Sequence, residues 1–270
     1  KVELPNYGVF DELRVFTVGP LPGPVGFRGL RVGLPICEDI WFEQVAECLL
    51  ETGAEILIVP NGSPYWQGKA EVRQQVAVAR VVETGLPLVY VNQCGAQDEL
   101  VFDGGSFGLN ADRTLAFQLP QFEPGVSLVT WKKSAGKWAC TDGPRATLPG
   151  LEEANWRACV VGLRDYVNKN GFPGVVLGLS GGIDSAVVAA MAVDALGHDR
   201  VHCVMMPYRY TAEESIADAA AIAKTLGIRY DIIPIAAPVE GFLAALDPLF
   251  AGREPDITEE NLQSRARGTI

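Results

Sequence analysis

Apolar and polar residues follow one another in an order that predicts strands alternating with helices. Apolar runs of strand length cover residues 30–36, 55–60 and 86–92, and short apolar runs bounded by turn residues are typical of buried strands. Helical patterns follow the first two runs, over about residues 37–53 and 69–83, and each stops near a glycine. This alternation predicts an α/β fold.

The pattern changes in the middle of the chain. Residues 98–129 carry short β runs broken by glycines, which indicates hairpins. Residues 131–150 carry charge, glycine and proline without a period. We therefore expect a first domain over residues 1–130, a connection over 131–150 and a second domain over 151–270.

The second domain begins with a predicted helix over residues 151–170, because its apolar residues recur at steps of four, three and four. Strand and helix patterns then alternate over residues 175–179, 183–196, 201–206, 213–226 and 230–235. This βαβαβ order predicts a doubly wound parallel sheet, in which ligands bind beyond the carboxyl ends of the strands.

A glycine pair separates the first strand of that sheet from its helix, in the motif Ser180-Gly181-Gly182-Ile183-Asp184-Ser185. A strand that breaks at glycines and restarts as a helix leaves backbone N–H groups free, and these groups suit a phosphate. The Asp184 carboxylate could hold a metal ion. The motif is not a Walker loop, because no Gly-Lys-Ser/Thr follows. The alternative is a tight turn whose glycines serve packing.

Cys37 stands at the end of a predicted strand, immediately before a helix start. This position exposes a thiol and places it near a helix dipole, which lowers a thiol pKa. Taken alone, a cysteine here is more often a packing residue. The two histidines, His198 and His202, lack partners at a metal-ligand spacing.

Composition narrows the class of protein. The 270 residues carry a net charge of −11, which argues against non-specific binding to nucleic acid or an anionic membrane. No apolar run has the length of a membrane span. The six cysteines are irregularly spaced without Cys-x-x-Cys, so we expect free thiols and a cytoplasmic location. Because the chain opens on Lys1 rather than methionine, we expect it to begin inside a longer protein.

The glycine motif and its surroundings resemble a known family. Residues 178–185 look like the PP-loop of the N-type ATP pyrophosphatases, and residues 205–211 and 259–268 narrow the resemblance to NAD synthetase. The resemblance implies that the whole loop binds ATP: Gly178, Leu179, Ser180, Gly181, Gly182, Ile183, Asp184 and Ser185. It also implies Mg²⁺ at Asp184 and a contact of Asn261 with deamido-NAD. Arg265 and Arg267 would either contact phosphate groups or simply lie on a solvated face of a helix. Arg209 and Thr211 would line the adenine pocket or shape a loop.

The first domain resembles the nitrilase superfamily, in the form found in glutamine-dependent NAD synthetases. Residues 34–41 look like its nucleophile strand and residues 1–12 like its lysine segment. The resemblance implies that Cys37 attacks the glutamine amide and that Lys1 stabilises the oxyanion. It places the glutamate base of the Glu-Lys-Cys triad upstream of the lysine, outside this chain. Tyr7, Ser63 and Lys69 match glutamine-binding positions, although ordinary turn and surface roles would fit Ser63 and Lys69 as well.

Together the two motif sets imply a nitrilase-like α-β-β-α sandwich followed by a PP-loop domain of the adenine nucleotide alpha hydrolase-like type. The implied activity is amidation of deamido-NAD(+), activated by ATP as the adenylate, with ammonia from glutamine. A homo-oligomer with channelled ammonia is also implied, and the chain by itself is expected to be inactive. Two alternatives remain. One is a GMP synthetase-type ligase, which is disfavoured because its glutaminase uses a Cys-His-Glu triad and the first domain contains no histidine. The other is a nucleotide-binding module without catalysis.

Overall fold

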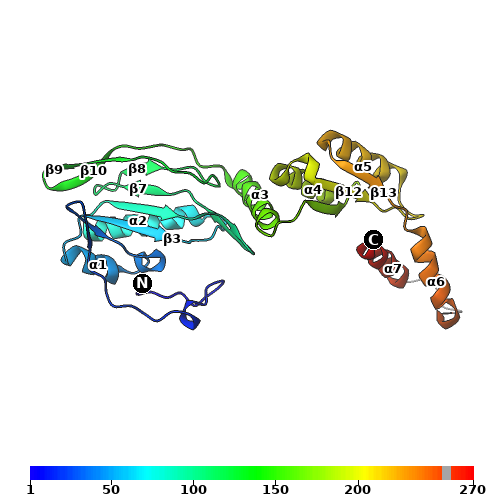
Figure 1. Ribbon diagram of the computed structural model, residues 1–270, viewed down its shortest axis with the longest axis horizontal. Coiled ribbons are helices and arrows are strands. Elements are labelled where there is room, and N and C mark those ends of the chain that lie inside the picture. Colours follow the sequence, from blue (N-terminus) through cyan, green and yellow to red (C-terminus); the bar gives the residue numbers. More distant parts are fainter. Residues whose placement is uncertain (251–256) are drawn as a thin grey trace. The chain divides into compact units, whose positions relative to one another are not determined.

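The computed structural model describes residues 1–250 and 257–270, and the chain divides into two compact units over residues 1–162 and 163–270 (Figure 1). The division falls within helix α3 (Leu151–Lys169), later along the chain than the expected boundary at residue 150. Among the described residues, no helix combines the length and apolarity that crossing a membrane requires.

The first unit is built on a six-stranded sheet with the order β1-β2-β3-β4-β7-β8. Its strands are β1 (Val25–Phe27), β2 (Leu30–Gly33), β3 (Ile56–Asn61), β4 (Leu88–Asn92), β7 (Phe107–Leu109) and β8 (Leu115–Gln118). Strands β2, β3 and β4 run parallel, and β1, β7 and β8 add antiparallel pairs at the two edges. The three apolar runs of the sequence therefore form the parallel centre of this sheet.

Two helices cover the sheet, α1 (Glu43–Glu51) and α2 (Lys69–Thr84). Their apolar faces and the central strands bury one core, with Leu49, Leu57 and Leu88 fully inaccessible to solvent. The helix predicted from residue 37 differs in its first part, where Cys37–Ile40 forms a 3-10 turn (η2) and α1 begins at Glu43. A second short turn, η1, covers Glu12–Arg14.

Two hairpins complete the first unit, β5 (Cys94–Gln97) with β6 (Leu100–Asp103), and β9 (Thr130–Ser134) with β10 (Lys137–Asp142). The second hairpin, which begins at Thr130, covers much of the segment predicted to be the interdomain connection, residues 131–150. It is held to the first unit by an ion pair between Lys133 and Glu55 and by a hydrogen bond from Cys140 N to Asn110 Oδ1 (2.9 Å). The structure thus adds a pair of strands that the composition of this segment did not indicate, because the two strands are ordered by pairing with each other.

The second unit has a three-stranded parallel sheet of β11 (Val175–Gly178), β12 (Val201–Met205) and β13 (Arg229–Ile232). The connecting helices are α4 (Ile183–Leu196) and α5 (Glu213–Leu226), and a 3-10 turn, η3 (His198–Arg200), precedes β12. Small alanines of both helices pack on β12, where Ala189, Cys203 and Ala219 are completely buried. The predicted βαβαβ order is confirmed.

Two further helices follow the sheet, α6 (Ala236–Phe250) and α7 (Ile257–Thr269). A small core joins them to the end of β12, with Ile235, Val239 and Ala266 buried beside Tyr208. This contact brings the last helix next to the carboxyl edge of the sheet, where the glycine loop lies.

Candidate active site

The nucleophile candidate of the first unit sits in a strained turn. Cys37 opens the 3-10 turn η2, and its φ of +53° lies in the left-handed region, which non-glycine residues rarely adopt. Such strain persists only where neighbouring contacts hold it, and it often marks a functional position. Here the turn carries the thiol from the end of the β2 segment into a cavity of about 600 Å³.

Lys1 lines the same cavity, so the structure brings together the two residues predicted to be catalytic. The Lys1 ammonium donates to both carboxylate oxygens of Glu12, at 2.6 and 2.5 Å. The two side chains are mostly buried, at 16% and 22% exposure, so the pair is less screened than a surface ion pair. Glu12 fixes the ammonium beside the thiol, a role that the sequence pattern did not indicate.

A second carboxylate joins the two segments that carry Lys1 and Cys37. Asp39 is 1% exposed, and its Oδ1 accepts hydrogen bonds from the backbone N–H groups of Val2 (2.9 Å) and Glu3 (2.8 Å). Its Oδ2 accepts from the N–H of Ile36 (2.9 Å), the residue before the nucleophile. One side chain therefore sets the register between the lysine segment and the cysteine turn.

The thiol environment differs from the sequence-based expectation. Burial raises the pKa of Cys37, because a thiolate is poorly solvated there. The Lys1 ammonium and a hydrogen bond from the Gly62 backbone oppose this shift, whereas Glu38 and Glu12 add to it. A lowered pKa was expected from the helix dipole, but α1 begins six residues later and desolvation is the larger effect.

Two of the three predicted glutamine-binding residues lie around an adjoining cavity of about 400 Å³, which shares Phe10 with the first. The Tyr7 hydroxyl donates to Glu38 Oε1 (2.7 Å). The Lys69 ammonium lies over the rings of Trp41 and Trp66, 4.6 and 5.1 Å from their centroids. Burial, followed by repulsion from Arg73, lowers the pKa of Lys69. The indole rings act in the opposite direction, because their faces attract the ammonium.

Ser63, the third of these residues, has a different environment. It is 6% exposed, and its hydroxyl accepts a hydrogen bond from Arg73 Nε (3.1 Å). Its contact with glutamine stays a prediction, because in this conformation the hydroxyl is engaged inside the protein.

The glycine loop of the second unit follows β11 and leads into α4. Ser180 and Ser185 close it: their hydroxyls lie 3.1 Å apart, and Ser185 Oγ accepts from Ser180 N (3.2 Å). Gly181 has a φ of +84°, and a Cβ there would lie 2.2 Å from the Ser215 carbonyl oxygen of α5. Glycine is therefore required by both the backbone conformation and the close approach of α5.

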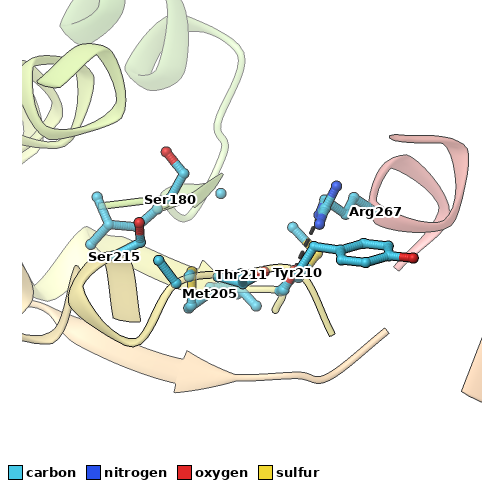
Figure 2. Close-up of a pocket in the computed structure, with 11 residues that line it drawn as sticks. Ser180, Met205, Tyr210, Thr211, Ser215 and Arg267 are labelled. Carbon is cyan, nitrogen blue, oxygen red and sulfur yellow. Dashed lines mark hydrogen bonds between the residues drawn. The ribbon is translucent and has the colours of Figure 1, made fainter. Parts of the chain in front are cut away.

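A cavity of about 580 Å³ opens beside this loop and is shown in Figure 2. Gly178, Leu179 and Ser180 line it on one side, and residues from the ends of β12 and α5 line the other. Arg267 reaches it from α7 and donates from Nε to the Met206 carbonyl oxygen (3.1 Å). Thr211 also lines the cavity, while Arg209 stacks on Tyr208 and Tyr210.

Two further predicted residues of the second unit are exposed to solvent. Asp184 is exposed in the first turn of α4, and Asn261 is exposed on α7. Within the described parts of the chain, no three His, Cys, Asp or Glu side chains gather in a way that could hold a metal ion. The predicted roles of Asp184 in metal binding and of Asn261 in deamido-NAD binding stay predictions.

Sequence reasoning missed Glu12, Asp39 and Arg73. The first two stand within the quoted motifs, but their partners lie 11 and up to 37 residues away. A buried acidic residue next to a candidate nucleophile was the available signal for Asp39, because such carboxylates need donors.

Family comparisons also assign two segments to the chain. The carbon-nitrogen hydrolase family matches residues 1–139, and the NAD synthase family matches residues 155–270. The first segment includes Lys1, Cys37 and Lys69, and the second includes the glycine loop and Arg267. Each candidate site therefore lies in the segment of the corresponding family.

The chain is similar over its whole length to glutamine-dependent NAD(+) synthetases of Rhodobacter capsulatus (51% identity, 49% of that protein covered) and Xylella fastidiosa (45%, 50% covered). It also matches the solved structure of glutamine-dependent NAD+ synthetase from Acinetobacter baumannii in complex with ADP. That match has a TM-score of 0.93 and 42% identity, and covers all of this chain and 51% of the other. The chain spans about half the length of these relatives. By its match over residues 1–139, the chain belongs to the carbon-nitrogen hydrolase family, and its residues 155–270 match the NAD synthase family.

Proposed function

We propose that the protein carrying this chain is a glutamine-hydrolysing NAD(+) synthase. The observation that carries the proposal is that one chain holds both kinds of site. In one unit, Cys37 lies in a strained turn and lines a cavity together with Lys1. In the other unit, a glycine loop of the phosphate-binding type lines a second cavity. Neither site alone makes an amide with nitrogen from glutamine. A thiol that releases ammonia and a loop that binds ATP supply the two halves of that reaction.

In the first half, Cys37 Sγ attacks the side-chain amide carbon of glutamine. The oxyanion of the tetrahedral intermediate is stabilised by the Lys1 ammonium, which Glu12 holds in place. Ammonia leaves with the carbon–nitrogen electron pair and the proton that the Cys37 thiol gave up, and a γ-glutamyl thioester on Cys37 remains. Water then hydrolyses the thioester to glutamate and restores the thiol. Tyr7, Ser63 and Lys69 are proposed to bind the amino-acid end of glutamine, for which the Lys69 cation suits the carboxylate.

In the second half, the carboxylate of deamido-NAD(+) attacks the α-phosphorus of ATP, and pyrophosphate leaves. Ammonia then displaces AMP from the acyl adenylate and gives NAD(+). We assign the loop from Gly178 to Ser185 to the ATP phosphates, because its open backbone and helix start suit anions. Asn261 is assigned to deamido-NAD(+). Asp184 would supply one carboxylate to Mg²⁺, which would neutralise phosphate charge.

The proposed cytoplasmic location rests on the free cysteines, and the proposed homo-oligomer rests on the family resemblance. Light scattering of the complete protein tests the second of these, since a single-chain mass would contradict it. The proposed substrates are small molecules, and the net charge of −11 argues against non-specific binding to nucleic acid.

The test uses the complete protein and its Cys37→Ala variant. With deamido-NAD(+), ATP and glutamine, we expect NAD(+) formation to fall at least about a thousandfold in the variant, because the nucleophile is lost. With ammonium chloride in place of glutamine, both proteins should form NAD(+) at similar rates. Cys159→Ala, at an exposed cysteine, is the matched control. Failure of the wild-type protein to consume deamido-NAD(+) with ATP would overturn the proposal.

A further inference from the structure

An ammonium group without a carboxylate partner lies between two tryptophan rings in the first unit. Lys69 is the first residue of α2, and its Nζ lies 4.6 Å from the ring centroid of Trp41 and 5.1 Å from that of Trp66. Both distances are in the range of a cation–π contact. Among the residues that the structure describes, the ammonium has no ion pair and no hydrogen bond to an oxygen atom.

The two indoles stabilise this ammonium in a way that a carboxylate could not. A ring face attracts a cation through its quadrupole but carries no net charge, so the charge of Lys69 is not neutralised. The N–H donors of the ammonium also stay free for oxygen acceptors. Lys1 is the contrast, because its ammonium donates to both oxygens of the Glu12 carboxylate. The surroundings of Lys69 therefore suit a cation that receives its anion from outside the chain.

The two rings come from segments that also build the cavity of Cys37. Trp41 follows the turn η2, which Cys37 opens, and its N–H donates to the Glu38 carbonyl oxygen (2.9 Å). Trp66 lies in the loop after β3, and its carbonyl oxygen accepts from the Lys69 N–H (3.0 Å). The turn that presents the thiol therefore also places one of the rings against the ammonium.

The ammonium lines a cavity that adjoins the cavity of the thiol. Lys69 and Trp66 line the space of about 400 Å³, which shares Phe10 with the space lined by Cys37. Glu99 lines it as well, but forms no ion pair with Lys69 in the described part of the chain. A glutamine whose amide lies at the thiol has its α-carboxylate at the far end of its carbon chain, where this cation can receive it.

We infer that Trp41 and Trp66 are positioning residues, which hold the Lys69 ammonium in place as the receptor for the α-carboxylate of glutamine. The rings thereby make the site selective for amides that carry a carboxylate over simple amides. The inference rests on the proposed function, because it takes glutamine as the nitrogen donor. The simpler role, in which the rings only cover the apolar stem of a lysine, would leave the discrimination between amides unchanged.

The test compares two amides as substrates of the complete protein. Glutamine is hydrolysed to glutamate, and 4-aminobutanamide, which lacks the α-carboxylate, is hydrolysed to 4-aminobutanoate; chromatography measures both products. Trp66→Leu should raise the KM for glutamine about fivefold with little change in kcat, because a freed lysine side chain must be ordered each time the substrate binds. The kcat/KM for 4-aminobutanamide should stay at the wild-type value. Since Trp66 is 50% exposed, the variant is expected to fold.

A conservative variant and a matched control accompany this comparison. Trp66→Tyr keeps an aromatic face and should bring the KM for glutamine back to within about twofold of the wild-type value. Trp138→Leu is the control, because Trp138 makes the same kind of contact with Lys133, whose ammonium lies 5.8 Å from its ring centroid. The control should leave the KM for glutamine unchanged. Equal increases in Trp138→Leu and Trp66→Leu would contradict the inference.

A double-mutant cycle tests whether the ring acts through the lysine. Lys69→Met should raise the KM for glutamine at least about tenfold, because the charged partner of the carboxylate is lost. Adding Trp66→Leu to Lys69→Met should then have no further effect, since there is no ammonium left to position. Additive effects would overturn the inference, because they would mean that Trp66 contacts the substrate independently of Lys69.

Trp41→Leu should show the same pattern, and its rate with 4-aminobutanamide reports whether the turn of Cys37 is intact. An equal loss with both amides would contradict the positioning role of Trp41. Two results separate this inference from the proposed function. A protein that shows the expected KM pattern but forms no NAD(+) from ammonia would uphold the inference and refute the proposed function. NAD(+) formation together with a wild-type KM for glutamine in Trp66→Leu would do the reverse.

Discussion

Asp39 shows how much of the first site depends on one side chain. Its two oxygens accept three backbone hydrogen bonds, two from the segment that begins with Lys1 and one from the residue before Cys37. A carboxylate is suited to this task because it only accepts hydrogen bonds, whereas an amide must also donate. The ammonium and the thiol are therefore held in register by a residue that touches neither.

Asp39→Asn should disturb this register while keeping the side-chain shape. An amide nitrogen would face one or more of the three N–H donors, so we expect the free energy of unfolding to fall by about 1–3 kcal/mol. Chemical denaturation measures this change, and glutamine-dependent turnover should fall with it. Asp11→Asn is the control, because its carboxylate is 55% exposed and pairs only with Arg14 on the surface. A loss of stability no larger than that of the control would contradict the assigned role.

At this scale the sequence predicted which residues carry the chemistry but not what holds them. Cys37 and Lys1 were predicted from their motifs and line one cavity. The supporting contacts of Asp39 and Arg73 were not predictable, because their partners lie 36–37 and 9–30 residues away. The local sequence pattern identifies a polar residue, whereas its hydrogen-bond partner depends on which distant segments the fold brings next to it.

The β11–loop–α4 element of the second unit depends on backbone geometry. The position of a Cβ on Gly181 would lie 2.2 Å from the Ser215 carbonyl oxygen of α5, so the loop and this helix pack directly against each other. Within the loop, the N–H groups of Ser180 and Gly182 donate to the hydroxyls of Ser185 (3.2 Å) and Ser180 (3.3 Å), beside the cavity that Gly178, Leu179 and Ser180 line. An element of this kind binds anions through its main chain, and its glycines are the residues that a substitution would affect most.

Gly181→Ala should therefore be costly for two separate reasons. The left-handed φ of +84° disfavours alanine, and the new Cβ would lie 2.2 Å from a backbone oxygen. We expect a loss of about 2–4 kcal/mol in the free energy of unfolding and at least about tenfold weaker ATP binding. Calorimetric titration and denaturant unfolding measure the two effects.

Gly197→Ala separates these reasons. Gly197 ends α4 with a φ of +81°, but nothing lies within 4 Å of its Cβ position. Its ψ of 155° places it in a region that is essentially restricted to glycine, so the variant should lose about 1–3 kcal/mol through the backbone conformation but keep ATP binding. If both variants behaved alike, the close approach of α5 would have no energetic importance.

Element prediction succeeded where apolar period and turn residues agreed. The parallel strands β2, β3 and β4 and the helices α2, α4 and α5 were all predicted close to their observed bounds. The sequence-based prediction did not identify the hairpin β9–β10, because its strands are mostly exposed and carry no alternating apolar face. Such strands are specified by pairing with each other and by contacts such as Lys133 with Glu55, neither of which leaves a periodic signal.

For the molecule as a whole, buried titratable groups link stability to pH. Tyr90 is 1% exposed in the first core, with its ring stacked on Phe107 at 5.1 Å. Burial raises the pKa of Tyr90 from 10.0 to about 12. The folded state therefore retains this proton at a pH where the unfolded chain releases it, so the stabilisation is complete below pH 10 and is lost as pH rises toward 12.

The free energy of unfolding should thus decline by about 2–3 kcal/mol between pH 10 and pH 12 through this one group. Tyr90→Phe should remove that part of the slope, as measured by denaturant titrations at several pH values. Tyr210→Phe, at a side chain that is 74% exposed, should leave the slope unchanged. An identical pH dependence in wild type and Tyr90→Phe would contradict the prediction.

The sequence by itself determined the order of strands and helices, the two-part organisation and the motifs that carry Cys37 and the glycine loop. These features are local, because apolar period, glycine positions and short motifs act within one or two turns of chain. The tertiary structure alone decided that Glu12 holds Lys1, that Asp39 joins the lysine segment to the cysteine turn, and that Trp41 and Trp66 lie against the Lys69 ammonium. It also decided that the Cys37 pKa is raised rather than lowered. Burial and long-range pairing set these properties, and both arise only when distant segments pack together.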